Sequence, residues 1–178
     1  DNQIVKFLIA RKFELPKVFE MIEKNLAWIA DYKPSADEFF PPDIAAEYPV
    51  GYSDCHDLDG NCIYVEKSGN MGFISPKKFI NKHGVPTIVR WHIAGNEMGK
   101  RRIAASPTAT RITAIVDMSN LGESDSNVMK FAKGISAIDQ DNYPEHLSRM
   151  LLINAPGRFS GLWKVIRIFL DSRTREKV

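Results

Sequence analysis

The segment from Arg111 to Asp117 constrains the fold most, because it is a continuous apolar run rich in β-branched side chains. Such a run is typical of a strand that is covered on both faces, as in a parallel sheet. A second short apolar run, at residues 150–154, is bounded by turn signals and predicts another strand. Helical patterns of ten to twenty residues separate the strands. The sequence therefore predicts an α/β domain with a mixed, largely parallel sheet flanked by helices.

Helices are predicted from the spacing of apolar residues and from prolines in first turns. Residues 15–32 have Pro16 in the first turn and an apolar stripe with spacings of four, four and three, made by Val18, Ile22, Leu26 and Ile29. Further helices are predicted at about 76–84, 85–104 and 127–138, in a short segment starting at residue 143, and in an amphipathic segment carrying Phe159, Trp163, Ile166 and Leu170.

The region between the first helix and the strands is rich in prolines and acidic residues. Residues 34–50 contain four prolines and predict a linker with room for only one short helix, near Ile44–Glu47. Asp59-Gly60 then predicts a hairpin turn, with residues 62–66 as the outgoing strand. Cys55 and Cys62 flank this turn and could pair, but two free thiols in a reducing cytosol are favoured.

The charge is distributed unevenly along the chain. Residues 34–75 carry a net charge of −7, residues 76–111 carry +7, and residues 158–178 have six basic and two acidic groups. Such segments could attract an anionic membrane surface or a nucleic acid, or they could simply face water. No aromatic-basic recognition motif accompanies the run Lys100-Arg101-Arg102, so no nucleic-acid partner is expected.

Several other classes of protein are excluded or not supported. The hydrophobic fraction of 44% and charged fraction of 26% are those of an ordinary soluble domain. No apolar run approaches the roughly 18 residues of a membrane span, and the N-terminal residues lack a signal-peptide pattern, so a cytoplasmic protein is expected. The four histidines lack metal-ligand spacing, and the glycine-rich stretches match neither a phosphate loop nor a hydrolase elbow. We therefore expect no metal, no cofactor and no enzymatic activity.

A family resemblance rests on motifs at both ends of the chain. Residues 7–13 read Phe-Leu-Ile-Ala-Arg-Lys-Phe, residues 143–145 read Tyr-Pro-Glu, and residues 154–156 read Asn-Ala-Pro. Phe169-Leu-Asp171 and Thr174-x-x-Lys177 follow near the end of the chain. In order and spacing these motifs resemble the CRAL-TRIO lipid-binding domain of the phosphatidylinositol-transfer branch. The resemblance covers nearly the whole chain and is strongest from Tyr-Pro-Glu to Asn-Ala-Pro.

The resemblance implies a domain organisation and a function. Residues 1–40 would end an N-terminal helical region, and residues 41–178 would form a CRAL-TRIO domain that stops before the family's last strand and gate helix. The sheet and helices would enclose an apolar pocket for one phospholipid. The expected function is binding of phosphatidylinositol and transfer or presentation of a phospholipid between membranes, with peripheral attachment to an anionic membrane surface. The alternative is a lipid-sensing regulatory or scaffolding module for a different hydrophobic ligand.

The resemblance also implies a set of site residues. Arg11 would frame the head-group phosphate, Glu145 would pair with Lys177, and Thr174 would donate to the phosphate. The predicted pocket lining is Ile112, Ala114 and Val116 on one strand face, covered by Phe159, Trp163 and Ile166.

Three departures from the family pattern bear on ligand choice and assembly. Ile9 and His146 replace arginines of the family motifs. Ile112 and Ala114 stand where phosphatidylcholine-exchanging members carry hydroxyls, so phosphatidylcholine is not the expected second ligand. A pocket without its closing helix would expose an apolar face, which a dimer or a swapped segment would cover.

Overall fold

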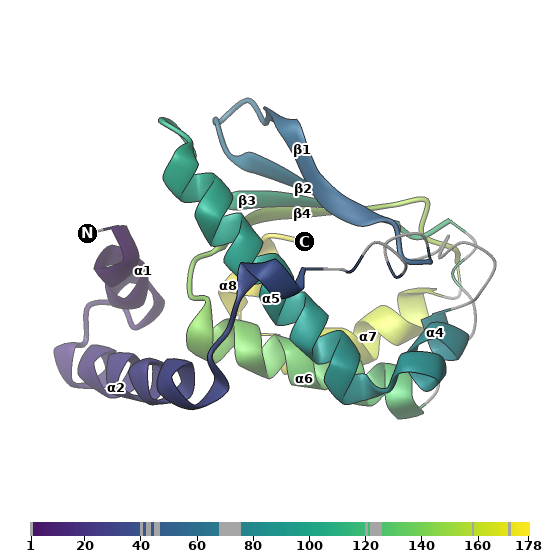
Figure 1. Ribbon diagram of the computed structural model, residues 1–178, viewed down its shortest axis with the longest axis horizontal. Coiled ribbons are helices and arrows are strands. Elements are labelled where there is room, and N and C mark those ends of the chain that lie inside the picture. The colour runs from purple at the N-terminus through teal and green to yellow at the C-terminus, as the bar shows by residue number, and fades with distance from the viewer. Residues whose placement is uncertain are drawn as a thin grey trace.

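The computed structural model describes residues 2–39, 41, 44, 47–67, 76–119, 121, 126–157, 159–170 and 172–178. Its helices are α1 (Asn2–Ala10), α2 (Leu15–Tyr32), the 3-10 helix η1 (Ala36–Glu38), α4 (Pro76–His83), α5 (Val85–Ala105), α6 (Ser126–Asn142), α7 (Phe159–Phe169) and α8 (Ser172–Glu176). Its strands are β1 (Val50–His56), β2 (Cys62–Glu66), β3 (Ile112–Asp117) and β4 (Leu147–Ile153) (Figure 1).

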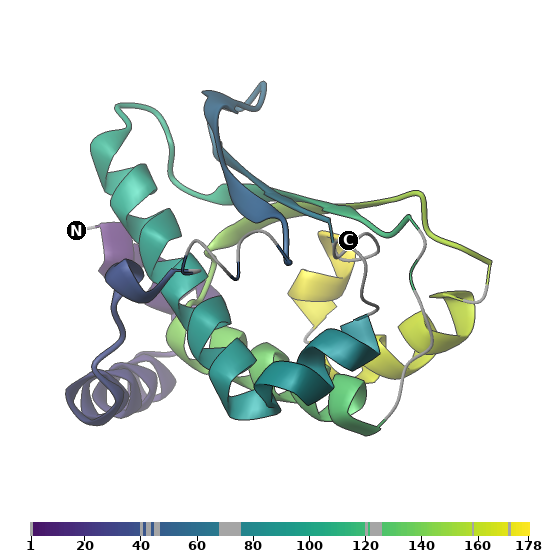
Figure 2. The ribbon, with the colours of Figure 1, turned by 45° about the vertical axis from the view of Figure 1, so that its right-hand side comes forward.

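The four strands form one mixed sheet in the order β1-β2-β3-β4. The β1-β2 hairpin is antiparallel, whereas β2, β3 and β4 run parallel to one another. Helices α4 and α5 connect β2 to β3, and α6 connects β3 to β4. In both views these helices and α7 lie on the same side of the sheet (Figures 1 and 2). The predicted mixed, largely parallel sheet flanked by helices is confirmed.

The two faces of β3 have different surroundings. Ile112, Ala114 and Val116 are 5%, 5% and 9% exposed. Their face is turned toward the helices, because Val116 clusters with Phe159 of α7. On the other face, β4 leaves Leu151 and Ile153 42% and 41% exposed. Within the described residues α4 to α7 lie on one side of the sheet, yet β3 itself is buried or half-buried on both faces, with Thr113 only 4% exposed on the side away from Val116.

Local signals explain where α4 and α5 meet. Gly84 adopts a φ of +81°, a conformation that favours glycine, and its N–H donates to the carbonyl of Ile80 at 2.8 Å. Val85 then begins α5, with Pro86 in the first turn, where its missing N–H has no helical partner to lose. The predicted boundary between these two helices is confirmed.

The apolar stripe predicted for α2 is only partly correct. Val18 is buried, but Leu26 and Ile29 are 60% and 37% exposed. The buried face continues instead through Met21 and Asn25. This happens because the first turns of α2 pack against the short helix α1, whereas its later turns contact α6 through polar groups. The Asn25 side-chain amide donates to the side chain of Asn142 at 3.1 Å.

Three further local predictions need correction or fall outside the structure. No short helix starts at Tyr143: α6 extends to Asn142, residues 143–145 form a turn, and β4 begins at Leu147 rather than at 150. The positive φ of Glu145, +51°, explains why the helical path ends there.

The short helix predicted near residues 44–47 lies largely outside the described residues, while η1 forms earlier in the linker. Both cysteines are free thiols.

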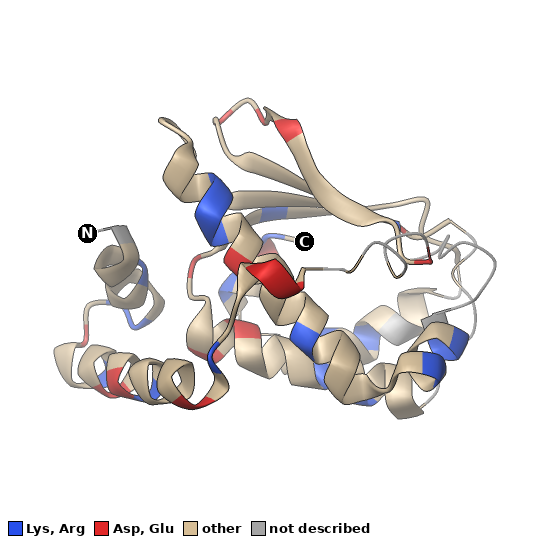
Figure 3. Cartoon of the chain, in the orientation of Figure 1, with Lys and Arg blue, Asp and Glu red and all other residues tan. Residues whose placement is uncertain are grey.

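The acidic and basic segments of the chain pair with each other. Arg101 lies 2.6 Å from Asp37, and Arg102 lies 3.0 Å from Asp54. Among the described residues of the two segments, Arg90 also pairs with Glu38, and Lys82 and His83 pair with Glu47. Charged residues of η1 and α5 can be followed in Figure 3. Exposed pairs contribute little to stability, so this charge pattern mainly directs the linker onto α4 and α5.

Candidate functional site

Glu145 lies at the centre of a buried group of charges. Its side chain is only 7% exposed. One carboxylate oxygen lies 3.1 Å from the ammonium of Lys177 and 3.1 Å from the guanidinium of Arg111. The other oxygen lies 3.1 Å from the guanidinium of Arg173. One carboxylate thus has three cationic partners, each at charge-assisted hydrogen-bond distance.

The parallel register of the sheet and the return of α8 bring these residues together. The N–H of Ile112 donates to the carbonyl of His146 at 2.9 Å, which places Arg111 beside Glu145. The N–H of Met150 donates to the carbonyl of Lys177 at 2.7 Å and fixes the end of α8 along β4. The side chain of Arg173 also donates to the carbonyl of Ile9, at 2.8 Å, and so ties α1 to the same place.

Lys6 of α1 adds a fourth cation to this group. Its side chain is buried, at 8% exposure, and within the described part of the chain no carboxylate lies at ion-pair distance from it. Burial, together with the charges of Arg111, Lys100 and Lys177, lowers the pKa of Lys6 to about 8, although Glu145 acts in the opposite direction. We call Lys6, Arg111, Glu145, Arg173 and Lys177 the Glu145 cluster.

The structure brings some of the predicted head-group residues together and leaves one apart. Glu145 and Lys177 are in contact, and Thr174 lies on α8 within the same turn as Lys177. Arg11 lies at the end of α1, where its charge acts on Glu20 and Lys24 of α2. Among the described ion pairs Glu145 is joined to Arg111, Arg173 and Lys177 and not to Arg11, whose charge acts on α2 instead.

Sequence reasoning missed Lys6, Arg111 and Arg173. A signal was present for Arg111, because residues that precede neighbouring parallel strands come to lie side by side. Arg111 is the first residue of the strand predicted at 111–117 and directly precedes β3, whereas Glu145 lies two residues before β4, which begins earlier than the predicted strand at 150–154. No comparable signal exists for Lys6, since α1 itself was not predicted.

An apolar pocket lies beside β4. It has a volume of about 390 Å³ and is lined by Met150, Leu151, Leu152, Ile153, Phe159, Trp163 and Val178. The rings of Phe159 and Trp163 stack with their centroids 6.2 Å apart. This volume is at the lower end of the roughly 300–1,000 Å³ typical of ligand pockets.

The predicted lining residues divide into two groups. Phe159 and Trp163 line this pocket. Val116 packs behind Phe159 in the same cluster, and Ile166 is half-buried on α7. Ile112 belongs to the core instead: its δ-methyl group lies only 2.4 Å from the position that a Cβ on Gly99 of α5 would take. Ala114, next along that face of β3, is equally buried.

The charged cluster and the apolar pocket adjoin at the end of α8. The side chain of Lys177 contacts Glu145, whereas the next residue, Val178, lines the pocket. Met150 lines the pocket and binds the carbonyl of Lys177. A molecule with a charged end and an apolar end could therefore contact both regions at once.

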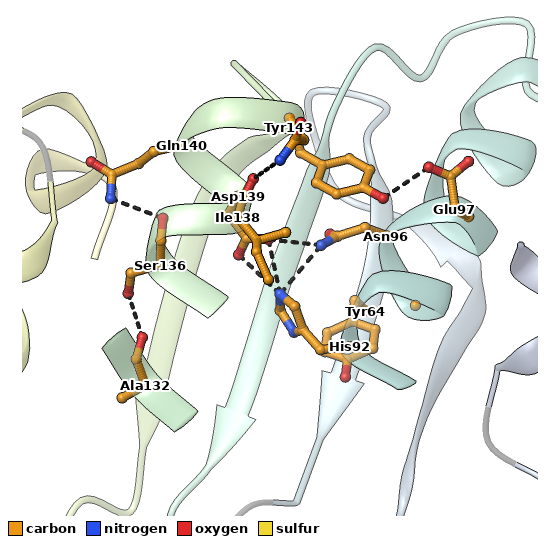
Figure 4. A network of polar contacts seen from close by, with 12 residues as sticks. Tyr64, His92, Asn96, Glu97, Ala132, Ser136, Ile138, Asp139, Gln140 and Tyr143 are labelled. Carbon is orange, nitrogen blue, oxygen red and sulfur yellow. Dashed lines mark hydrogen bonds and ion pairs between the residues drawn. The ribbon is translucent and has the colours of Figure 1, made fainter. Parts of the chain in front are cut away.

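A second polar network holds the turn that carries Glu145. The His92 ring nitrogen lies 2.9 and 3.0 Å from the two carboxylate oxygens of Asp139, and Asn96 donates to Asp139 at 2.8 Å (Figure 4). Burial disfavours the charged imidazole, but the Asp139 carboxylate outweighs it and raises the pKa of His92. The Tyr143 hydroxyl donates to Glu97 at 2.9 Å. These contacts join α5 to α6 and fix Tyr143, two residues before Glu145.

His146 does not contribute a charge to the site. Burial, with the nearby charges of Lys6 and Lys100, lowers the pKa of His146 to about 3. Its imidazole is therefore neutral near pH 7, and its Nε2 is a buried atom with no hydrogen-bond partner among the described residues. The arginine charge that this position has in the resembling family is absent here, whereas Arg111 and Arg173 surround Glu145.

Comparisons with known proteins point to one family. Residues 50–178 match the CRAL/TRIO domain family. The chain is 31% identical over 198 residues to the phosphatidylinositol/phosphatidylcholine transfer protein SFH9 of Arabidopsis thaliana, covering 99% of this chain and 32% of that protein. It is 29% identical over 192 residues to the SEC14 cytosolic factor of Yarrowia lipolytica, covering 100% of this chain and 38% of that protein. The chain thus spans about a third of the length of each of these two curated relatives.

A solved structure has the same fold. The crystal structure of Sfh5 superposes with a TM-score of 0.83 at 21% sequence identity, covering 99% of this chain and 62% of that one. Within the described residues, none of the helices is long and apolar enough to cross a membrane.

Proposed function

This chain belongs to the CRAL/TRIO domain family, and from that premise we propose that it binds phosphatidylinositol and carries or presents a phospholipid between membranes without breaking bonds. Two relatives that are similar over essentially the whole chain support this proposal. One is named a phosphatidylinositol/phosphatidylcholine transfer protein and the other a cytosolic factor. The proposed head-group residues are Glu145, Thr174 and Lys177. Arg11 stays a prediction of the family resemblance alone.

The observation that carries the proposal is the contact between the Glu145 cluster and the apolar pocket at Lys177-Val178. Burying one methylene group contributes about 0.8 kcal/mol, so acyl chains supply most of the affinity of an apolar site. A phosphate placed at the cluster would gain charge-assisted hydrogen bonds, which are roughly twice as strong as neutral ones. This pairing of a cationic and an apolar region suits a phospholipid better than a wholly polar or wholly apolar ligand.

Transfer of labelled phosphatidylinositol between two vesicle populations by the full-length protein tests the proposal. We expect transfer of phosphatidylinositol to exceed transfer of phosphatidylcholine. Ile112 and Ala114, which stand where the family resemblance places hydroxyls for phosphatidylcholine, are apolar side chains packed in the core, and an unpartnered phosphate beside them would be unfavourable. If the protein extracts no phosphatidylinositol, or transfers phosphatidylcholine more strongly, the proposal is wrong.

The membrane-facing surface that we propose is the exposed side of α7. Ile168 and Val165 are 73% and 43% exposed there. Lys164 and Arg167 are exposed on the same helix. An amphipathic helix that presents apolar and basic side chains together is typical of attachment to an anionic membrane surface. Helix α7 also supplies Phe159 and Trp163 to the pocket, so this side of the protein would meet the membrane beside the pocket.

Ile168→Glu is expected to weaken binding to anionic vesicles about 30-fold. The substitution removes an exposed apolar side chain and adds a charge that anionic lipids repel, each worth about 1 kcal/mol at such a surface. Co-sedimentation with vesicles of defined anionic-lipid content measures the effect. Leu58→Glu is the matched control, since Leu58 is fully exposed at the β1-β2 hairpin and gains the same charge. Equal vesicle binding by the two variants would show that α7 does not contact the membrane.

A further inference from the structure

The Glu145 cluster contains more positive charge than an unphosphorylated inositol lipid requires. Lys6, Arg111, Arg173 and Lys177 supply four cations, and Glu145 supplies one carboxylate, which gives a net charge of +3 when all are ionised. The neighbouring Lys100 and Glu97 pair with each other at 3.1 Å and cancel. The phosphodiester of phosphatidylinositol carries one negative charge, which would leave about two positive charges without a counter-charge.

The burial of Lys6 among other cations indicates that an anion could bind here. The residue is 8% exposed, and the charges that act on it are the three cations Arg111, Lys100 and Lys177 and the single carboxylate of Glu145. A buried ammonium ordinarily has a carboxylate or another hydrogen-bonding partner, because burying an unpaired charge is strongly unfavourable. Glu145 already serves three other cations within the cluster. Glu145 acts on Lys6 only from beyond ion-pair distance, so a bound anion would supply the counter-charge in which the cluster as a whole is deficient.

The two arginines give the cluster an accessible side. Arg111 is 35% exposed and Arg173 is 45% exposed, whereas Glu145 beneath them is 7% exposed. Each guanidinium has five N–H donors, more than Glu145 occupies, and its planar fork matches phosphate geometry. A phosphate arriving from solvent would therefore meet free donors of Arg111 and Arg173 first, above the shielded carboxylate.

We propose that the Glu145 cluster binds an inositol head group that carries an additional phosphomonoester, so that the lipid class of this chain is a phosphorylated phosphoinositide. This inference rests on the proposed function, since the site is the same. A phosphomonoester carries about −1.5 to −2 at pH 7. With the phosphodiester charge of −1, such a head group totals about −2.5 to −3 and matches the +3 of the cluster.

The first experiment compares soluble head groups by calorimetry with the full-length protein. The probes are glycerophosphoinositol, glycerophosphoinositol 4-phosphate and inorganic phosphate. We expect the monoester-bearing head group to bind at least about tenfold more tightly than glycerophosphoinositol, which is the effect of one or two additional hydrogen bonds to charged groups. Vesicles containing either phosphatidylinositol or its monophosphate provide the lipid arm, in which the same order of affinity is expected.

Matched variants test whether the preference for the monoester head group comes from the Glu145 cluster. Lys6→Gln and Arg173→Gln should each reduce the affinity for the monoester head group about tenfold while changing the affinity for glycerophosphoinositol much less. Arg149→Gln is the control, because it also removes one positive charge but lies on β4, 59% exposed and 3.7 Å from Asp59. It should leave both affinities unchanged.

A pH profile separates a role in binding from a merely structural role. Because the pKa of Lys6 is about 8, raising the pH from about 7 to about 9 removes its charge and should weaken binding of the monoester head group. The ligand keeps its charge over this range, since its second pKa is about 6. The other charged or titratable groups around Lys6 are Arg111, Glu145, Lys100, Lys177 and His146. They are the same in the parent and in Lys6→Arg, so the difference between the pH profiles of these two proteins reports on Lys6. Lys6→Arg should bind with little pH dependence, because arginine stays protonated.

The outcomes distinguish this inference from the proposed function. Equal affinity for the two inositol head groups, with transfer of phosphatidylinositol intact, would overturn the inference and leave the function standing. Tight binding of the monoester head group without any lipid transfer would support the inference about the head group. It would overturn the proposal that the protein carries lipid between membranes. Inorganic phosphate binding as tightly as the monoester head group would show a site for free phosphate and overturn the lipid preference.

Discussion

Glu145→Gln is expected to lower the free energy of unfolding by about 3 kcal/mol. The substitution keeps the size of the side chain but removes the one negative charge of the Glu145 cluster. Lys6 and Lys177, at 8% and 17% exposure, would then be buried cations without a counter-charge. Arg111 and Arg173 are partly solvated, so the loss should fall at the lower end of the roughly 3–5 kcal/mol measured for broken buried pairs.

Urea denaturation followed by far-ultraviolet circular dichroism measures this loss. The control is Glu20→Gln, which also replaces a carboxylate that contacts a lysine, but at an exposed site on α2 where Lys24 lies 2.6 Å away. Exposed helix pairs contribute only about 0.3–0.5 kcal/mol, so the control should unfold almost as the parent does. A loss below about 1 kcal/mol for Glu145→Gln would show that solvent, and not the carboxylate, neutralises the cluster.

The backbone at position 145 supports the same reasoning. Glu145 has a φ of +51°, in the left-handed region that glycine occupies without steric penalty. For a residue with a Cβ this conformation costs about 1–2 kcal/mol. The three contacts of its carboxylate offset that cost. Glycine would relieve the backbone but abolish all three contacts, so the position depends on the side chain.

The sheet could be predicted because its strands have signals that do not depend on the rest of the fold. The run that became β3 is apolar without interruption, and Asp59-Gly60 marks the hairpin between β1 and β2. The turn at residues 143–145 could not be predicted, because a proline after Tyr143 is as compatible with a helix start as with a turn. The buried face of α2 depends on where α1 packs, which its own apolar spacing does not contain.

The candidate site shows the same division between local and tertiary information. Thr174 and Lys177 are three residues apart in one short motif, and Glu145 belongs to the Tyr-Pro-Glu motif. All three residues could therefore be named from the sequence. Lys6 and Arg111 reach Glu145 only through the position of α1 and the register of β3 with β4. Arg11 is close to Lys6 in sequence, yet its charge acts on Glu20 of α2. A motif therefore identifies the carboxylate, and the fold decides which cations surround it.

The charge segments show how a sequence pattern can support two interpretations. The excess of +7 at residues 76–111 could have indicated an anionic partner. The structure instead pairs Arg101 with Asp37 and Arg102 with Asp54, within the chain. Arg111, at the end of that segment, instead joins a cluster with excess positive charge. Net charge along the sequence therefore locates anion sites only after internal pairs are subtracted.

Lys177→Ala in the full-length protein is expected to reduce phosphatidylinositol transfer more than tenfold, to the background of the assay. Lys177 joins the Glu145 cluster to the pocket, because its ammonium contacts Glu145, Val178 lines the pocket, and the N–H of Met150 donates to the Lys177 carbonyl. Alanine keeps that backbone contact, so the apolar pocket should persist. Arg111 and Arg173 still neutralise Glu145, so the fold should lose less stability than in Glu145→Gln.

The measurement is vesicle-to-vesicle transfer of labelled phosphatidylinositol, with the urea midpoint recorded for each variant so that unfolding is not mistaken for lost binding. Lys177→Arg should retain part of the transfer, because arginine keeps the charge and can contact both Glu145 and a phosphate. Arg149→Ala, which removes a cation from β4 outside the cluster, should transfer at the parental rate. Unchanged transfer by a folded Lys177→Ala would place the head group elsewhere, because no other residue joins the charged cluster to the described pocket as Lys177 does.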